Sequence, residues 1–416
     1  MKAPEGFEQA SGLHHVDTED APHGTGSPHS LTVMLFALVG GQVCLHSSMA
    51  GLRMAEPLHA LRDGHGSGEV GVLLGLFAFA AMVLALPAGR FADRHGSRKP
   101  AIASIALGVT GGLIAVIVPH YIALCVSALC VGAAANAGMI SLQRSAGRLA
   151  DTPSQLRRVF GWLGVAPAVA NFVGPFMAGL LIDHGGFRVG FLVLALLPLL
   201  GLLAVRYMPR EKPKPPPAAA HPEGRRPRTW DLLADPAMRR LLLVNWLISA
   251  SWDVHGFVVP ILGYERGLSA SAIGTILGVF ALSVGVVRIV LPMLVDHLRE
   301  SVVLVVAMVA VALVFVAYSF SGRAWTMGTC AMLLGLALGG AQPIILSILH
   351  QITPANRHGE SIALRSLTLN LSSTAMPLAF GAIGVAVGAG TLFWVMAAIV
   401  GVGAWSARRV SAVSGH

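Results

Sequence analysis

The 416-residue chain is 55% hydrophobic and only 12% charged, which is about half the charged share of a soluble globular protein. This composition excludes a soluble globular protein and indicates a membrane protein with many spans. The formal net charge of +9 does not indicate a nucleic-acid-binding protein, because the Lys and Arg residues stand between apolar runs, as they do in oriented membrane proteins.

A polar segment and a long series of apolar runs follow one another along the chain. Residues 1–30 lean acidic and contain no apolar core, so we expect a disordered N-terminal tail. A helix needs about 20 apolar residues to cross a bilayer. Twelve runs of this kind centre on 31–52, 69–89, 100–118, 121–143, 160–182, 189–207, 241–262, 270–292, 301–320, 325–349, 361–386 and 390–407. The predicted fold class is an all-α integral membrane protein with twelve transmembrane helices.

A segment rich in proline and arginine separates the first six runs from the last six. It covers residues 208–240, where the density of proline is incompatible with a helix and the charges are incompatible with burial. The sequence therefore predicts an N-terminal six-helix bundle at 31–207 and a cytoplasmic linker at 208–240. A C-terminal six-helix bundle at 241–407 and a cytoplasmic tail at 408–416 follow.

The cationic residues predict the orientation in the membrane. If the N-terminus is cytoplasmic, the cytoplasmic segments carry most of the linker cluster together with Arg90, Arg94, Arg98, Lys99, Arg144, Arg148, Arg157, Arg158, Arg299, Arg357, Arg408 and Arg409. The connections on the other side carry Arg53, Arg62, Arg188, Arg266 and Arg323. The positive-inside rule then predicts that both termini are cytoplasmic.

The two predicted bundles contain the same marker residues at a nearly constant shift. A shift of 203 or 202 positions relates Gly71 to Gly274, Gly75 to Gly278, Asp93 to Asp296, Gly132 to Gly335, Pro175 to Pro377 and Gly179 to Gly381. Parallel repeats of six helices are the plan of transporters whose halves rock around a central site. We therefore expect two pseudo-symmetric halves.

The loop between the second and third predicted helices resembles a family signature. It reads Gly89-x-x-x-Asp93-Arg94-x-Gly96-x-Arg98-Lys99 and resembles the signature loop of the major facilitator superfamily. A weaker copy between the eighth and ninth helices begins with Pro292 in place of glycine and contains Asp296 and Arg299. The resemblance covers residues 30–407 and implies a secondary transporter of a bacterial inner membrane.

The resemblance also implies that this loop is part of a conformational gate. A helix N-terminus favours a nearby anion, and in the superfamily the helix next to the loop is the eleventh, which starts near Ser361 here. We expect Asp93 to face that helix, with Arg144 or Arg148 sharing its carboxylate, and to hold the outward-open state. Asp296 with Arg299 is expected to act likewise against the fifth helix.

The fifth predicted helix carries a second resemblance. Its residues Gly164, Asn171, Gly174, Pro175 and Gly179 resemble the antiporter motif of bacterial drug/proton exporters. Glycine and proline there also permit a kink and close helix contact. One departure is Ala128, which stands where these exporters usually carry an arginine. If that arginine serves proton coupling in relatives, this chain couples through other groups or not through protons.

Polar side chains within the apolar runs mark a candidate substrate cavity. Such side chains normally face a cavity or a partner, because hydrocarbon does not solvate them. In the superfamily fold the first, fourth, seventh and tenth helices line the cavity. The candidates on these helices are Gln42, His46, Arg53, Asn136, Asn245, Trp246, Ser249, Trp252, Asp253 and Gln342. Arg288 and Arg365, on other helices, are expected to be structural.

Asp253 is the candidate proton-coupling group, with His46 as the second. It is the only acid near the middle of a predicted span, and burial disfavours the charged form of a carboxyl group. The alternative is a static partner for His46, His255 or an arginine. Arg53 and Glu56, three residues apart near the end of the first run, are spaced to pair with each other.

These features favour proton-coupled efflux of a small amphipathic or drug-like compound by alternating access. The sequence has no ATP-binding loop of the P-loop type, so ion gradients are the expected energy source. The alternative is an uptake symporter or uniporter for an organic anion or another small metabolite. We expect a monomer that is not an enzyme, with no metal, cofactor or nucleic acid; its partners are the substrate, protons and the bilayer.

Overall fold

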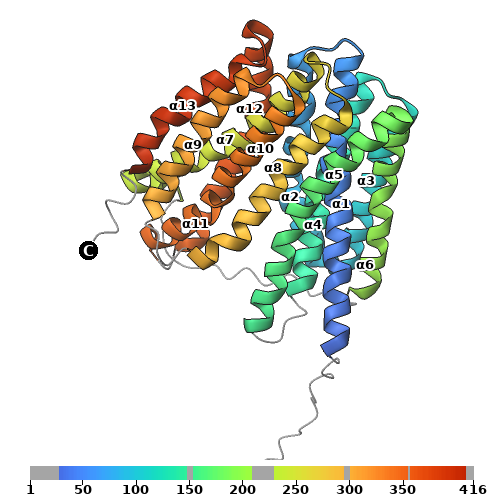
Figure 1. The fold of residues 1–416 in the computed structure, drawn as a ribbon. Coiled ribbons are helices and arrows are strands. Elements are labelled where there is room, and N and C mark those ends of the chain that lie inside the picture. Colours follow the sequence, from blue (N-terminus) through green and yellow to red (C-terminus); the bar gives the residue numbers. More distant parts are fainter. Residues whose placement is uncertain (1–27, 148–152, 209–228, 295–299, 355–356, 409–416) are drawn as a thin grey trace, which may run out of the picture.

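All regular structure in the described part of the chain is helical. The computed structural model describes residues 28–147, 153–208, 229–294, 300–354 and 357–408. The first half contains α1 (Pro28–Arg62), α2 (Ser67–His95), α3 (Arg98–Ile117), α4 (Tyr121–Gly147), α5 (Pro153–Leu196), η1 (Leu197–Leu200) and α6 (Gly201–Tyr207). The second half contains η2 (Thr229–Ala234), α7 (Pro236–Glu265), α8 (Ala270–Leu294), α9 (Glu300–Phe320), α10 (Ala324–Gly339), α11 (Ala341–Ile352), α12 (His358–Val387) and α13 (Thr391–Arg408). The predicted all-α membrane fold is confirmed, and Figure 1 shows the two halves side by side.

The number of spans agrees with the prediction once one bent stretch is counted as two helices. Eleven helical stretches of the described residues are long and apolar enough to cross a membrane. One of them, Gly161–Tyr207, has 47 residues and would be about 70 Å long if straight, against a hydrocarbon core of about 30 Å. The stretch bends at Gly186, whose φ of 76° lies in the left-handed region, and Gly190 packs against Ile182 across the bend. The two arms are the fifth and sixth predicted helices.

The tenth predicted helix is interrupted at Gly340. α10 ends at Gly339 and α11 begins at Ala341. Pro343 has no N–H group to donate to the carbonyl of Gly339, and its ring disfavours a continuous helix. The sequence predicted one unbroken helix at 325–349, and the structure adds a bend next to Gln342.

Two predicted boundaries are corrected by the structure. α1 continues to Arg62, so that Arg53 and Glu56 lie well inside the helix rather than near its end. The last residues of the predicted linker are helical, because η2 covers Thr229–Ala234 and α7 begins at Pro236. The Asp235 carboxylate accepts a hydrogen bond from the N–H of Ala237 (2.8 Å), and a capping aspartate followed by proline starts a helix.

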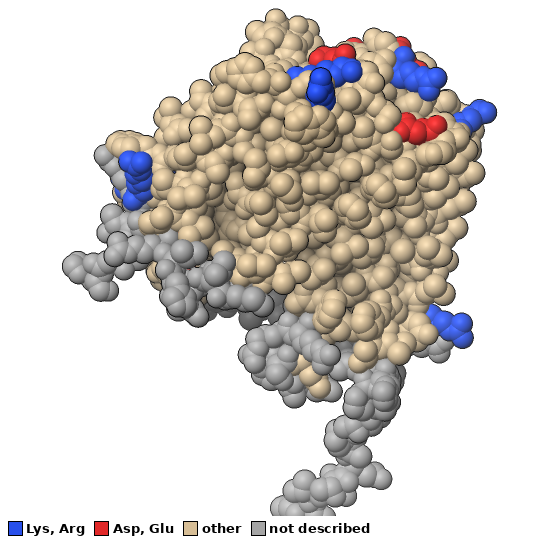
Figure 2. Space-filling view, in the orientation of Figure 1, with Lys and Arg blue, Asp and Glu red and all other residues tan. Residues whose placement is uncertain are grey.

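The bundle has two ends separated by an uncharged band. The end at which α1 begins is called the terminal end here, and the end at which α1 connects to α2 is called the opposite end (Figure 1). Figure 2 shows charged side chains near the two ends of the visible face and a broad band without charge between them. Such a band matches the hydrocarbon core of a bilayer. The protein is therefore a multi-pass membrane protein.

Two helix pairs join the halves closely at the opposite end, α2 with α12 and α5 with α8. A methyl group added to Gly71 of α2 would fall within 3.0 Å of the carbonyl oxygen of Pro377 on α12. A methyl group on Gly274 of α8 would meet the carbonyl oxygen of Pro175 on α5 in the same way. These residues are the pairs that the sequence shift relates, so the sequence repeat is also a repeat of contacts.

A second pair of contacts obeys the same relation. Gly179 of α5 packs on the backbone of Ala270, and Gly381 of α12 packs on the backbone of Ser67, each within 3.0 Å of an added methyl group. Ser67 and Ala270 are again 203 positions apart. Glycine at these positions lets the backbones of the two halves touch.

The halves lie farther apart at the terminal end. Gly89 near the end of α2, and Gly161 and Gly164 near the start of α5, have no atom within 4 Å of an added methyl group. A cavity lies there between α5 of the first half and α8, α11 and α12 of the second. This conformation is therefore closed at the opposite end and more open at the terminal end.

Candidate functional site

Two opposite charges, one from each half, interact near the centre of the molecule. Arg53 of α1 and Asp253 of α7 interact electrostatically, and Asp253 is only 4% exposed. The Asp253 carboxylate accepts hydrogen bonds from the hydroxyl groups of Ser372 (2.8 Å) and Ser373 (3.2 Å) on α12. One carboxyl group thus connects a helix of the first half with two helices of the second.

A small cavity lies between the halves next to this pair. Its volume is about 80 Å³, well below the roughly 300–1,000 Å³ of small-molecule sites. Helices of both halves contribute its walls, which include Arg53, Met54, Asn171, Pro175, Trp252, His255 and Phe280. The central cavity is therefore too small for a drug-sized compound in this conformation.

Aromatic contacts hold the α7 side of this cavity. Trp252 packs edge-to-face on Phe280, with 4.6 Å between the ring centroids. His255 lies against the same ring, and its Nε2 shares a hydrogen bond with the hydroxyl group of Tyr318 (3.0 Å). Of the partners considered for Asp253, the structure therefore supports an arginine, whereas His255 is paired with Tyr318.

Glu56 is a second buried acid that the sequence did not identify as buried. Its side chain is 0% exposed, and one carboxyl oxygen accepts a hydrogen bond from the hydroxyl group of Ser127 on α4 (2.6 Å). Its other oxygen has no hydrogen-bond partner among the described residues. The spacing that allowed Glu56 to pair with Arg53 was misleading, because no contact between the two is found among the described residues and Arg53 interacts electrostatically with Asp253 instead. The signal in the sequence was the apolar stretch that continues beyond Glu56 to Leu61.

Other cavity candidates have different surroundings. Gln42 and Asn245 are 2% and 0% exposed, and their side-chain amides have no hydrogen-bond partner within the described residues. The Asn136 side chain donates to a carbonyl of α2 (2.8 Å), and that of Asn171 donates to a carbonyl of its own helix (2.8 Å). Three further candidates are half-buried or buried on α1 and α7, namely His46, Trp246 and Ser249.

The residues at the junction of α2 and α3 contact the half of the molecule to which they belong. Asp93 forms an ion pair with Arg144 at the end of α4, which is one of the two arginines expected to share its carboxylate. Gly96 ends α2 with a φ of 75°, a left-handed conformation that favours glycine. The space around Gly89, the first residue of the signature loop, is open in this conformation.

The other residues of the predicted gate are exposed, are half-buried or lie outside the described part of the chain. Arg94 is exposed and Arg98 is half-buried in the first turn of α3. Arg148, Asp296 and Arg299 lie outside the described residues. The expected contact of Asp296 therefore stays a prediction.

The opposite end carries a contact between the halves that the sequence did not reveal. The Asp183 carboxylate of α5 accepts hydrogen bonds from the backbone N–H groups of Ala270 (3.0 Å) and Ser271 (2.9 Å), the first residues of α8. A carboxylate at a helix N-terminus satisfies unpaired donors and is favoured by the helix dipole. This is the arrangement predicted for Asp93 at the other end of the molecule.

A larger cavity lies toward the terminal end. Its volume is about 460 Å³, and it lies between α5 of the first half and α8, α11 and α12 of the second. Gln342, predicted for the central cavity, lines this one together with Pro343, Arg288 and Arg365. The bend at Gly340 places Gln342 at the start of α11.

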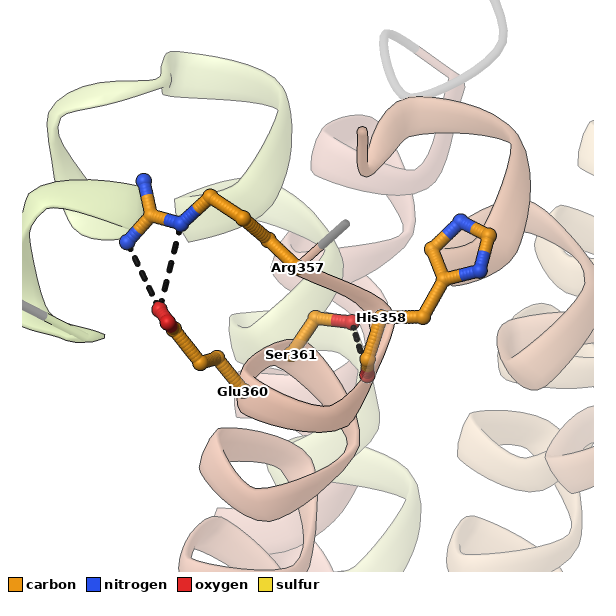
Figure 3. Close-up of polar contacts among 4 residues, drawn as sticks. All are labelled: Arg357, His358, Glu360 and Ser361. Carbon is orange, nitrogen blue, oxygen red and sulfur yellow. Dashed lines mark hydrogen bonds and ion pairs between the residues drawn. The ribbon is translucent and has the colours of Figure 1, made fainter. Parts of the chain in front are cut away.

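The start of α12 is stabilised by its own residues. The Arg357 guanidinium donates two hydrogen bonds to the Glu360 carboxylate (3.1 and 2.7 Å), and the hydroxyl group of Ser361 donates to the carbonyl of His358 (2.9 Å), as Figure 3 shows. Arg357 is thereby paired with a carboxylate of its own helix. The N-terminus of α12, expected to face Asp93, has these local contacts in this conformation.

Comparison with known proteins agrees with this architecture. The chain matches the Major Facilitator Superfamily over residues 38–242 and 241–413. It is 27% identical to the tetracycline resistance protein, class G, of Vibrio anguillarum over 76% of this chain and 81% of the relative. It is 26% identical to the multidrug resistance protein MdtG of Citrobacter koseri over 58% of this chain and 60% of the relative. A solved peptide transporter POT in complex with sulfate has the same fold, with a TM-score of 0.75, 14% identity and coverage of 92% of this chain and 95% of that one.

Proposed function

Because the chain belongs to the Major Facilitator Superfamily and is a membrane transporter, we propose that it exports a small amphipathic or drug-like compound in exchange for protons. The two relatives named for drug resistance support export. The halves alternate between two conformations, one open at each end, and the substrate crosses through the space between them.

The proposal places the terminal end in the cytoplasm of a bacterium. Described cationic residues at that end include Arg90, Arg94, Arg98, Lys99, Arg144, Arg206, Arg239, Arg240, Arg357 and Arg408, against Arg62, Arg188, Arg266 and Arg323 at the opposite end. The positive-inside rule puts the richer end in the cytoplasm. The conformation described here is then inward-facing, ready to take up a compound from the cytoplasm or the inner leaflet.

The observation that carries proton coupling is the buried Asp253 with Arg53 across the halves. Asp253 of α7 accepts hydrogen bonds from two hydroxyl groups of α12 and interacts electrostatically with a cation of α1. Protonation would remove the negative charge that attracts Arg53, so the contact between α1 and α7 would weaken when a proton binds and strengthen when it leaves. A charge pair that spans both halves and adjoins the central cavity thereby links proton binding to the conformational change.

Transport in oriented vesicles tests the direction. In inside-out vesicles with an acidic lumen, export predicts accumulation of the probe tetracycline that stops when a protonophore collapses the gradient. Accumulation in right-side-out vesicles instead, or accumulation that ignores the gradient, would contradict proton-coupled export of this probe.

The Asp253→Asn variant tests the coupling group. Reconstituted in proteoliposomes, this variant is expected to lose gradient-driven flux and to retain exchange of substrate for substrate at equal pH. The matched control is Asp63→Asn, because Asp63 pairs with His59 in its own helix at the opposite end. Unchanged gradient dependence in Asp253→Asn would eliminate Asp253 as the coupling group.

The second candidate function is uptake of an organic anion. Two features favour it: Arg53 borders the central cavity, and Ala128 stands where drug exporters usually carry an arginine. The same vesicle experiment separates the two functions, because uptake reverses the orientation in which the probe accumulates.

A further inference from the structure

Among the described residues that line the cavity at the terminal end, two are cations and none is a carboxylate. Arg288 of α8 and Arg365 of α12 line it, and no Asp or Glu is among the described residues of its walls. The Arg365 guanidinium donates a hydrogen bond to Oε1 of Gln342 on α11, and its buried Nε has no hydrogen-bond partner among the described residues. A neutral amide does not compensate a guanidinium charge, so the described walls of the cavity carry an excess of positive charge.

A nearby arginine of the same helix shows how this chain balances a cation. Arg357, eight residues before Arg365, is paired with Glu360 through two hydrogen bonds (Figure 3). Arginine within an apolar span is costly and normally faces a partner or a cavity. Arg365 faces a cavity and lacks such a carboxylate, and this difference points to a ligand.

The remaining walls indicate the rest of that ligand. Val165, Ala168, Ile289 and Leu346 supply apolar surface, and the open space beside Gly161 and Gly164 leaves room for a bulky group. A volume of about 460 Å³ falls within the roughly 300–1,000 Å³ of small-molecule sites. The planar guanidinium fork matches a carboxylate or a similar oxyanion.

We propose that this cavity binds an organic anion that carries an apolar body, with Arg365 and Arg288 holding its anionic group. The inference rests on the proposed transport path between the halves and names the chemical class of compound that enters it from the terminal end. It differs from the expectation from the sequence that both arginines are structural. An arginine that only packs its stem on apolar surface and keeps its guanidinium in water would not discriminate between an anion and its neutral analogue.

Binding of two nearly isosteric probes tests the charge requirement. The purified full-length chain in phosphatidylcholine nanodiscs is titrated by calorimetry with 2-naphthoate and with the neutral 2-naphthamide, without any gradient. The expected result is binding of naphthoate at least about tenfold tighter than of naphthamide, the size expected for one charge-assisted hydrogen bond. Equal affinity for the two probes would overturn the proposal.

Variants assign the discrimination to the cavity. Arg365→Gln is expected to lower naphthoate affinity about tenfold and to leave naphthamide affinity unchanged, and Arg288→Gln is expected to act in the same direction. Arg323→Gln, at the opposite end before α10, is the matched control and should have no effect. Gly161→Leu should weaken both probes by filling the cavity, which tests the site even if an arginine variant fails to fold. Loss of discrimination in Arg323→Gln, or its retention in both cavity arginine variants, would refute the assignment.

Lipid composition separates a free organic anion from a lipid headgroup. Addition of phosphatidylglycerol to the nanodiscs should leave naphthoate affinity unchanged. If phosphatidylglycerol displaces naphthoate from the wild type and not from Arg365→Gln, the site belongs to an anionic lipid and the proposal is wrong. Because binding is measured without transport, a failed export experiment leaves this result standing, and failed binding leaves export untouched.

Discussion

Asp183 is expected to stabilise the conformation that is closed at the opposite end. Its carboxylate belongs to the first half and binds two backbone N–H groups at the start of α8, in the second half. These hydrogen bonds have to break when the halves separate at that end. Removing the charge should therefore shift the equilibrium toward the conformation that is open at the opposite end.

The size of this shift follows from the two bonds, which measure 3.0 and 2.9 Å. A hydrogen bond to a charged group contributes about 1.5–3 kcal/mol, but Asp183 is exposed, and solvent reduces that figure. Asp183→Asn keeps one acceptor oxygen, so we expect the closed conformation to lose about 1 kcal/mol of stability relative to the open one. This corresponds to about a fivefold change in the ratio of the two conformations. Asp183→Ala removes both acceptors, for about 2 kcal/mol and about 30-fold.

Spin-label distances across the opposite end measure this ratio. Labels at Arg188→Cys in the first half and Glu265→Cys in the second report the separation, since both side chains are exposed. The four native cysteines, Cys44, Cys125, Cys130 and Cys330, are replaced by serine beforehand. The population at long distance should increase in the order wild type, Asp183→Asn, Asp183→Ala.

Asp63→Asn provides the control for a lost charge at the same end. Asp63 pairs with His59 within α1 (3.0 Å) and does not connect the halves through that contact. An equal shift in Asp63→Asn, or unchanged distances in Asp183→Ala, would refute the role given to Asp183.

Three further predictions concern close contacts and buried bonds. Gly274→Ala places a methyl group within 3.0 Å of a carbonyl of α5, so the same spin labels should report a smaller population of the closed conformation. Gly161→Ala is the control, because its methyl group meets open space, and it should not change the spin-label distances. Asp93→Asn, which weakens the ion pair with α4, should lower the turnover of transport more than the affinity for substrate; equal losses in flux assays and binding titrations would argue against a gate. Ser127→Ala removes the 2.6 Å hydrogen bond to the buried Glu56, so thermal denaturation should show a free energy of unfolding that is lower by about 1–3 kcal/mol. An unchanged melting temperature would mean that this hydrogen bond contributes little to stability.

The sequence predicted the spans well because the bilayer acts on each segment separately. An apolar run of sufficient length predicts a helix whatever it packs against, and the predicted runs correspond to the helices of the structure. One error falls where charges interrupt such a run, and another where Pro343 breaks the tenth helix. Arg53 and Glu56 were expected near the end of the first helix, although both lie well inside a helix that continues to Arg62.

The candidate site was only partly predictable. Asp253 was identified because an acid in the middle of an apolar run is rare, and the structure gives it Arg53 and two serines as partners. Asp183 gave no comparable signal, because its partners are backbone N–H groups 87 and 88 residues away. Every residue except proline has a backbone N–H group, so the residue type does not mark it as a partner of Asp183. Such a contact is visible only in the folded chain.

The sequence by itself determined the membrane character, the spans and the two related halves. Each of these depends on local composition or on a repeated spacing of glycine and proline, both of which can be read along the chain. Only the tertiary structure decided which end of the bundle is closed, which glycines bring the halves together, that Arg53 interacts with Asp253 rather than with Glu56, and that Arg288 and Arg365 share a cavity. These features depend on how the two halves are rotated against each other, and that rotation brings together side chains whose distance along the sequence carries no information about their distance in space.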